Sequence, residues 1–304
     1  MKYTNGLRGL VPGIFALALL AAGAGFLWPG EGAPYPWTTV RGETVMINGH
    51  GLYFYDTVSS VAQMQGNDIV TLFVGLPLLA ISFWMAQKGS LRGHLLLTGT
   101  LGFFLYTYMS MCFGTAYNPL FLVYVALFGL SLYAFILSML AFDLAQLPQR
   151  FSEHLPRRTI ASFFVVLGAF LSLAWLGRIA PTLLQGTTPA LENVTSMFIQ
   201  AMDLALIVPL AILAALLLWR RSAWGYLLAS VAIMKFVTMG LAVSVMGLNM
   251  WRAGVPTSPV ELGIFPTITV VNLVLAVLLL SNIDSASAQS APFIRKPLHT
   301  SHSP

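Results

Sequence analysis

Charged residues are scarce in this sequence. Asp, Glu, Lys and Arg together make up 8% of its 304 residues, and 57% of the residues are hydrophobic. A soluble domain carries about 25% charged residues, so this composition excludes an ordinary soluble domain. It indicates a multi-pass integral membrane protein whose main partner is the lipid bilayer. We assign the net charge of +5 to basic loops between helices, so we expect no nucleic-acid partner.

Cysteine and metal-binding patterns are almost absent as well. The single cysteine, Cys112, excludes an intrachain disulfide and a cysteine zinc site. No second histidine, cysteine or carboxylate stands at ligand spacing from His50, so the sequence predicts no metal site. It has no His-x-x-x-His pair, no glycine-rich phosphate loop and no paired haem histidines, so we expect no cofactor. An enzymatic role is left open, and it is the less favoured interpretation.

Long hydrophobic runs make up most of the chain. Eight of them have the apolar character of helices that cross a bilayer core of about 30 Å. The runs cover residues 10–28, 68–86, 94–113, 119–140, 160–176, 197–219, 226–247 and 267–281. A cleaved signal peptide is the alternative for the first run, because Ala21-Ala22-Gly23 offers small residues, but its length favours a retained helix. We therefore predict an all-α membrane protein with eight transmembrane helices.

The basic residues are distributed unevenly between the two sides of these helices. Of the 15 lysines and arginines, eleven fall in the terminal segments and in the loops on one side of the predicted bundle. Only Arg41, Arg178 and Arg252 fall on the other side, and Lys235 lies within a run. Basic loops stay in the cytoplasm, so both termini are predicted to be cytoplasmic. We expect a membrane domain over 1–281 and a disordered cytoplasmic tail over 282–304, rich in Ser, Ala and Pro.

The longest non-membrane segment, 29–67, has a regular pattern and is predicted to be ordered on the outer side. Apolar residues alternate on both sides of Asn48-Gly49, which predicts a β-hairpin with that pair at its turn. Asp56 is then expected to cap a short helix over 57–65. Gly66-Asn67 is expected to break that helix, and Asp68 to cap the second membrane helix.

Part of the sequence occurs twice in similar form. Residues 77–93 and 209–225 share a proline, a basic turn and a closing glycine at an offset of 132 residues. This spacing predicts two repeats of four helices each, over 1–141 and 157–281. An even number of helices per repeat makes the two repeats parallel. The alternative is that any two membrane hairpins with basic turns look alike.

Polar residues within the helices gather toward the outer side and are the candidate ligand-binding residues. Asp203 and Lys235 are the strongest candidates, because a charge inside a membrane is costly and needs a structural or functional reason. The candidates are Asp203, Lys235, Gln200, Tyr106, Tyr108, Asn118 and Asp68. They predict a polar cavity open to the outer side and roofed by segment 29–67. The alternative for the tyrosines is the ordinary aromatic belt at the membrane surface.

The two membrane charges are not expected to pair directly. Asp203 lies about six residues, or roughly 9 Å, further out than the level opposite Lys235. Side chains lean toward the N-terminus of their helix, so Asp203 should lean outward and Lys235 inward. We therefore expect Lys235 to find polar partners on another helix. It is a candidate proton-coupling group or site for an anionic head group, and Asp203 with Gln200 is a candidate site for a cation or an amine.

One stretch resembles a known group of proteins. The run 51–57, Gly-Leu-Tyr-Phe-Tyr-Asp-Thr, followed by 66–72, Gly-Asn-Asp-Ile-Val-Thr-Leu, and by Pro77 is similar to a pattern in uncharacterised bacterial multi-pass membrane proteins. The resemblance implies a bacterial inner-membrane location and no particular activity. The function that we favour from the residues is transport or binding of a small molecule. An intramembrane enzyme for a lipid or isoprenoid, with Asp56, Asp68 and Asp203 as its acids, and a sensor or scaffold subunit are the alternatives. The oligomeric state is left open.

Overall fold

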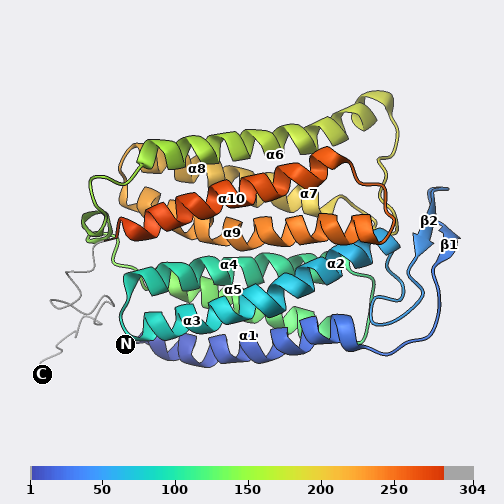
Figure 1. Ribbon diagram of the computed structural model, residues 1–304, viewed down its shortest axis with the longest axis horizontal. Coiled ribbons are helices and arrows are strands. Elements are labelled where there is room, and N and C mark those ends of the chain that lie inside the picture. The colour runs from blue at the N-terminus through green and yellow to red at the C-terminus, as the bar shows by residue number, and fades with distance from the viewer. Residues whose placement is uncertain (1, 284–304) are drawn as a thin grey trace, which may run out of the picture.

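The computed structural model describes residues 2–283, with side chains from residue 5 onward. Within this range eight helical spans are long and apolar enough to cross a membrane, which confirms the predicted fold class. The spans lie side by side along one direction, and a two-stranded sheet stands beyond one end of them (Figure 1). We call this end the hairpin end. The opposite end, which holds Lys88, Arg220 and the 141–156 loop, is called the basic end.

Each half of the chain supplies four spans, and the second span of each half contains a π-helical turn. The first half consists of α1 (Lys2–Leu27), α2 (Val58–Val70), the turn η1 (Thr71–Gly75), α3 (Leu76–Gln87), α4 (Leu91–Gly114) and α5 (Phe121–Leu140). The second half consists of the short helix η2 (Leu147–Arg150), α6 (Arg157–Gln185), α7 (Phe198–Met202), the turn η3 (Asp203–Ile207), α8 (Val208–Trp219), α9 (Ala223–Arg252) and α10 (Pro259–Ser281). Elements α2, η1 and α3 form one continuous span, as do α7, η3 and α8.

The hairpin after α1 exists, but its predicted register is wrong. Strands β1 (Tyr35–Thr38) and β2 (Thr44–Ile47) pair antiparallel around the turn at 39–43, where Gly42 has a φ of 81°. Asn48 and Gly49 instead begin a separate compact loop that follows β2. The Asn48 side chain donates to the carbonyl groups of His50 and Tyr53, at 2.7 and 3.3 Å, and so stabilises that loop locally. An Asn-Gly pair thus formed a side-chain-stabilised loop here, not a hairpin turn.

The second span begins earlier than predicted and has no break. Thr57, not Asp56, is the N-cap of α2, and its hydroxyl accepts a hydrogen bond from the Ser60 amide at 3.1 Å. The helix continues through Gly66 and Asn67, so Asp68 is buried within it and caps nothing. Gly66 is required by packing: a Cβ there would lie 2.8 Å from the Met246 Cα of α9.

The helices of the second half also extend further toward the hairpin end than predicted. Helix α6 continues nine residues beyond 176 to Gln185 and is capped by Gly186, which has a φ of 64°. Helix α9 ends at Arg252 rather than near 247. Helix α10 begins at Pro259 rather than 267, because Ser258 and Glu261 form a reciprocal capping box at its start. The predicted loops at 177–196 and 248–266 are correspondingly shorter.

The two halves share detailed local structure at the predicted offset of 132 residues. The turns η1 and η3 occupy equivalent positions, and a proline follows each, Pro77 and Pro209. A proline has no amide hydrogen and its ring crowds the carbonyl four residues earlier, which explains why a widened turn precedes each one. The offset was visible in the sequence, and the π-helical turns were not.

The loops at the basic end match in the same way. Gly89 has a φ of 79° in the first half, and the equivalent Arg221 has a φ of 56°. The glycines that follow, Gly93 and Gly225, both touch the preceding helix so closely that a Cβ would lie 2.3 Å from Met85 and 2.2 Å from Leu217. Equivalent residues at this offset therefore make equivalent contacts.

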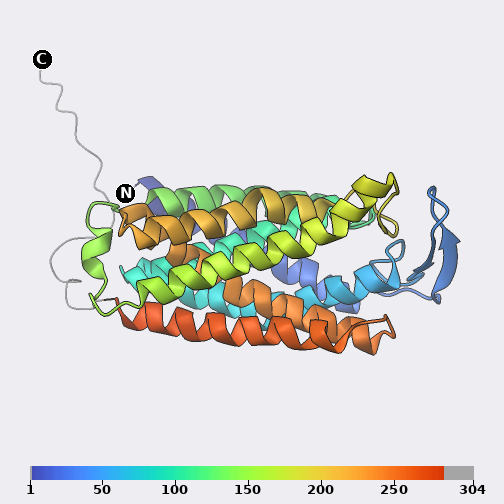
Figure 2. The same ribbon diagram turned by 90° about the horizontal axis from the view of Figure 1, so that it is seen from above.

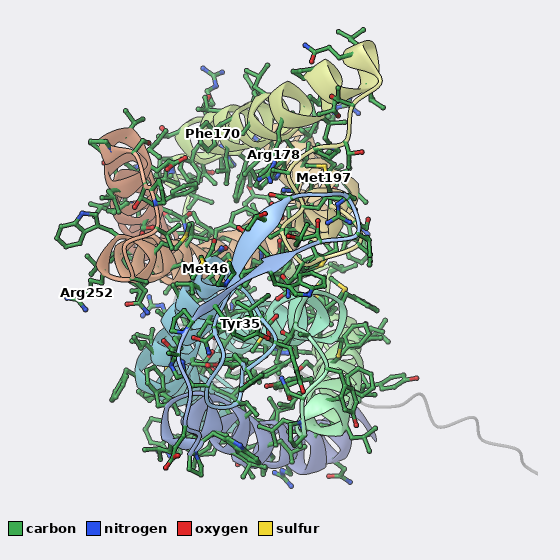
Figure 3. All side chains as sticks on the ribbon, turned by 90° about the vertical axis from the view of Figure 1, so that its right-hand side faces the viewer. Tyr35, Met46, Phe170, Arg178, Met197 and Arg252 are labelled. Carbon is green, nitrogen blue, oxygen red and sulfur yellow. The ribbon has the colours of Figure 1, made fainter. Side chains whose placement is uncertain are left out.

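The two halves pack against each other mainly through α2, α4 and α9. Buried apolar side chains form one large cluster in each half, and α4 contributes to both. Gly99 of α4 allows the close approach of α9, since a Cβ there would lie 2.3 Å from the Met234 Cβ. Viewed from the hairpin end, the sheet lies across the boundary between the halves (Figure 3).

Candidate functional site

Asp203 is the centre of a buried polar cluster at the junction of the halves. It is the first residue of η3, and its side chain is 9% exposed. The Tyr106 hydroxyl of α4 donates to its Oδ1 at 2.6 Å, and the Trp175 indole of α6 donates to its Oδ2 at 2.9 Å. Two donors from two other helices thus satisfy both oxygens and hold the carboxylate in one orientation. Charge-assisted hydrogen bonds of this kind are about twice as strong as neutral ones.

Lys235 lies on the other side of Tyr106. Its stem crosses α4 at Gly102, where a Cβ would lie 3.5 Å from the Lys235 Cγ. Its Nζ stands 4.1 Å from the centre of the Tyr106 ring and 5.2 Å from that of Phe236. The face of an aromatic ring attracts a cation, and the attraction grows when the cation is desolvated. The ammonium group therefore has an aromatic partner on another helix.

The predicted direction of the Lys235 side chain is wrong. We expected it to lean toward the basic end, away from Asp203. Tyr106 is one helical turn nearer the hairpin end than Gly102, so the side chain points toward the hairpin end. The reason is local: Gly102 leaves room beside the stem, and Tyr106 offers both its ring face to the cation and its hydroxyl to Asp203. Among residues 5–283 no ion pair joins Asp203 and Lys235, and Tyr106 connects them.

The seven residues that the sequence suggested for ligand binding lie in two polar clusters and one turn. Tyr106 and Lys235 lie in the Asp203 cluster, and Gln200 is buried on α7, one helical turn before Asp203. Asp68 and Tyr108 lie in a second cluster in the first half. Asn118 supports the turn before α5, where its Oδ1 accepts from the Leu120 amide at 3.0 Å.

The second cluster lies near the hairpin end of the first half. Tyr53, from the loop after β2, donates its hydroxyl to Asp68 Oδ2 at 2.7 Å. Burial, followed by the charge of Asp68, raises the pKa of Tyr53 well above its ordinary value, so the phenol stays protonated. Tyr108 and Tyr124 stack nearly parallel, with their ring centres 6.4 Å apart. The loop that contains Tyr53 therefore covers a buried acid, which agrees in part with the predicted roof over a polar site.

Asp56 is a further buried acid in the same region. It is 1% exposed, and its Oδ1 accepts from the Ala116 amide at 2.9 Å. Burial raises the pKa of this carboxyl to about 7, against a smaller opposing effect from the hydrogen bonds of Ala116 and Asn193. Asp56 is thus partly protonated at neutral pH and changes charge near it.

Sequence reasoning missed one polar group near the basic end. The side chain of His94 is 8% exposed and is stacked on Phe142 with ring centres 3.9 Å apart. Its Nε2 lies 3.2 Å from the Ser138 hydroxyl of α5, which is 2.6 Å from the Thr98 hydroxyl. His94 and Thr98 share one face of α4 at a spacing of four residues, and that signal was available in the sequence.

The segment between α1 and α2 is tied to the loop between α6 and α7. Arg41 donates to the carbonyl oxygens of Glu192 and Val194, at 2.8 and 3.0 Å. The Thr57 hydroxyl donates to the Glu192 carboxylate, and Asn193 donates to the Tyr55 carbonyl at 2.9 Å. We call these bonds the strap, because they connect the two halves at the hairpin end.

Comparison of the chain with known protein families, with curated proteins and with solved structures finds no match. The site therefore has to be interpreted from its own geometry.

Proposed function

We propose that this protein is a transporter or permease for a small molecule, which binds at the junction of the two halves. The observation that carries the proposal is the pair of π-helical turns, η1 and η3, in corresponding positions of the halves. In transporters built from two repeats, corresponding interrupted helices mark the substrate site. Each turn here adjoins a buried carboxylate, since Asp68 lies one helical turn before η1 and Asp203 begins η3.

The cluster around Asp203 offers two opposite charges to a ligand. Asp203 with Gln200 suits a cationic or amine group. The Lys235 ammonium has aromatic partners but no anion within ion-pair distance among the described residues, so it suits an anionic group. Charged groups at this depth are rare in membrane proteins and commonly belong to substrate pathways or proton relays. These features support a small ligand that carries an anionic group together with a cationic or amine group.

The basic loops support an orientation for this site. Lysine and arginine gather at the basic end, which we therefore place in the cytoplasm of a bacterial cell. The hairpin end then faces the outside of the inner membrane. The Asp203 cluster lies closer to that end, which favours entry of a ligand from outside.

A pocket between α9 and α10 bears on the alternative of a lipid-modifying enzyme. It measures about 400 Å³ and is lined by Ser244, Val245, Leu248, Trp251, Leu262 and Pro266. Its lining contains no carboxylate, and Asp56, Asp68 and Asp203 are not among the lining residues. The pocket suits an apolar chain, and the acids that catalysis would need are elsewhere. Transport therefore remains the better supported function.

Access to the site from both sides of the membrane tests the proposal without knowledge of the substrate. In a Cys112→Ser background, Gln200→Cys would be treated with a membrane-impermeant maleimide in spheroplasts and in inverted vesicles. A transporter exposes its site alternately, so position 200 should react in both preparations. Reaction from the hairpin end alone would indicate a receptor or enzyme, and reaction from neither side a scaffold.

Two control variants calibrate this experiment. Thr38→Cys, on the exposed strand β1, should react only in spheroplasts. Val271→Cys, on the outward face of α10 with 44% of its side chain exposed, should contact lipid and react in neither preparation. A thermal-shift screen of metabolites, with Asp203→Asn and Lys235→Met run in parallel, would then identify the ligand, because binding raises stability by mass action.

A further inference from the structure

Asp68 is a buried acid that faces no basic residue. It is 3% exposed within the second membrane span, and the Tyr53 hydroxyl is its one hydrogen-bond partner among the described side chains. No lysine or arginine forms an ion pair with Asp68 or Asp56 within residues 5–283. Buried charges are normally paired or bound to an ion. From the contacts that follow, we infer that a small monovalent cation binds beside Asp68, at a site separate from the Asp203 cluster.

A buried hydroxyl without a partner points to the same place. Tyr124 is 1% exposed, and its hydroxyl makes no hydrogen bond in the described part of the chain. Asn118 and Tyr53 are the nearest polar neighbours of this hydroxyl, and the charges of Asp68 and Asp56 act on it from further away. The Asp56 Oδ2 is also buried, and the Ala116 amide reaches only the Oδ1 of this carboxyl. Buried polar groups in native structures nearly always have a partner, so a buried phenol without a hydrogen bond in the neighbourhood of buried acids supports a bound species.

The remaining walls of the site are aromatic and tightly packed. Phe104, Tyr108 and Tyr124 form a stack with centre distances of 6.2 and 6.4 Å. On the opposite side α1 approaches so closely that a Cβ at Gly25 would lie 2.1 Å from the Asp68 Oδ2 and 3.1 Å from the Tyr53 hydroxyl oxygen. Gly25 therefore leaves the space in which Asp68 and Tyr53 meet, and the cation would bind next to that space.

The available donors determine the class of ion. They are carboxylate and phenol oxygens, which are ligands for hard cations. The described residues contain no group of three or more His, Cys, Asp or Glu that could hold a metal ion, which argues against a divalent or transition metal. Two carboxyl groups, one of which is partly protonated at neutral pH, balance a single positive charge. Sodium, potassium and a small alkylammonium ion share this chemistry.

Cation-dependent stability of the purified full chain tests the inference. Thermal unfolding in detergent would be followed by tryptophan fluorescence while NaCl, KCl or methylammonium chloride replaces N-methyl-glucamine chloride at constant ionic strength and pH. We expect a saturable rise in Tm with at least one of the three small cations. Equal Tm values in all four salts would overturn the inference. If Tm rises, the salt that raises it identifies the bound cation.

Four variants test whether the cation that raises the Tm binds beside Asp68. Asp68→Asn removes the charge, Tyr124→Phe removes the unpartnered hydroxyl, and Gly25→Ala fills the space beside Asp68. Each should abolish the rise in Tm or increase the half-saturating concentration at least tenfold. Gly23→Ala is the matched control on the same helix, because a Cβ there meets nothing within 4 Å, and it should respond as the wild type does. An unchanged response in Asp68→Asn and Tyr124→Phe would overturn the inference.

The inference can fail independently of the proposed function. Asp203→Asn and Lys235→Met should retain the cation response, because both residues lie outside this site. Loss of the response in these two variants, with retention in Asp68→Asn, would place the cation at the Asp203 cluster and contradict the inference. If Asp68→Asn does not fold, the comparison of Tyr124→Phe with Gly23→Ala decides the question.

Discussion

Tyr106 connects a positive and a negative charge that do not touch each other. Its hydroxyl binds Asp203, and its ring face receives the Lys235 ammonium. Removal of either charge leaves the other buried without compensation, so the two substitutions should not be additive. We expect the double variant Asp203→Asn/Lys235→Met to lose about 1–3 kcal/mol less stability than the sum of the losses in the two single variants. Thermal unfolding of the four proteins measures this coupling, and additivity within about 0.5 kcal/mol would exclude it.

Asp56 should make the stability of the protein depend on pH. The folded protein raises the pKa of this carboxyl from 3.8 to about 7, so folding favours its protonated form. Its stabilising contribution is complete below pH 4, is lost as the pH rises to about 7, and then stays constant. The loss is about 4 kcal/mol at most, at 1.36 kcal/mol per pKa unit. Tm measured from pH 5 to 8 should fall in the wild type and vary less in Asp56→Asn.

The exposed acid Glu31 provides the control for this pH series. Glu31→Gln should retain the pH dependence of the wild type, because its side chain is in water in both states. A pH profile that is the same for the wild type and Asp56→Asn would show that other groups cause the dependence.

The sequence showed which charged residues lie within the membrane spans, but not which residues they contact. Asp203 and Lys235 were identifiable because charge within a hydrophobic run is costly. Trp175 was not, because an indole near the end of a hydrophobic run normally belongs to the surface belt. Its hydrogen bond to Asp203 depends on how α6 packs against η3. Likewise, the direction of Lys235 depended on the space beside Gly102, a residue 133 positions earlier in the chain.

The two turns at the basic end allow the same helix contact to be tested twice. Gly93 and Gly225 lie against the preceding helix, where a Cβ would meet backbone atoms of Ala86 at 2.8 Å and of Leu218 at 2.3 Å. We expect Gly93→Ala and Gly225→Ala to destabilise the protein by similar amounts, about 1–3 kcal/mol each, because the helices must move apart. Gly129→Ala, in α5 with nothing within 4 Å, should be neutral or stabilising because alanine favours helix. Measurement of the Tm of the three variants and the wild type tests whether the two close helix contacts are equally sensitive.

Arg221 carries a backbone strain that its counterpart avoids. It has a φ of 56°, a conformation that costs a residue with a side chain about 1 kcal/mol and costs glycine almost nothing. Arg221→Gly should therefore raise the Tm, and Gly89→Ala should lower it. The opposite ranking in thermal unfolding would mean that the arginine side chain contributes more than the strain removes.

At the scale of helices, hydropathy located every span but not every end. The pattern Ser258-Pro-Val-Glu261 is a capping box with proline at its first helical position, and it was available as a signal for the start of α10. The length of α2 was not available in this way, since Gly66 and Asn67 normally interrupt helices. Here Gly66 is retained for the close contact with α9, which tertiary packing alone determines.

The molecule as a whole consists of two half-bundles joined through α2, α4 and α9. Because each half has its own apolar cluster, the halves should assemble when made as separate chains. We expect fragments divided between Ala145 and Gln146, which are both exposed, to co-purify in equal amounts when co-expressed. Substitution of Gly99 by leucine in one fragment should reduce the yield of the complex, because its Cβ would meet α9. Independent purification of the fragments, with no association, would contradict this arrangement.

The number of spans and the repeat offset were predicted from the sequence, but the arrangement of the halves was not. Hydrophobic length and proline spacing follow from local chemistry. Which helices meet across the boundary depends on small residues, such as Gly66 and Gly99, that look alike wherever they occur in a membrane helix. The sequence predicted one polar cavity, whereas the structure has two separate polar clusters, one in the first half and one at the junction of the halves. The helix contacts that separate them were not visible in the sequence.

The hydrogen bonds of the strap would affect the rate of a transport cycle. Arg41, Thr57 and Asn193 form hydrogen bonds between the two halves at the hairpin end. If the halves rock against each other during transport, these bonds must break and form again in every cycle. The time needed for one cycle would then be determined by loops that never contact the cargo, and evolution could tune the throughput of the protein there without altering its affinity or selectivity.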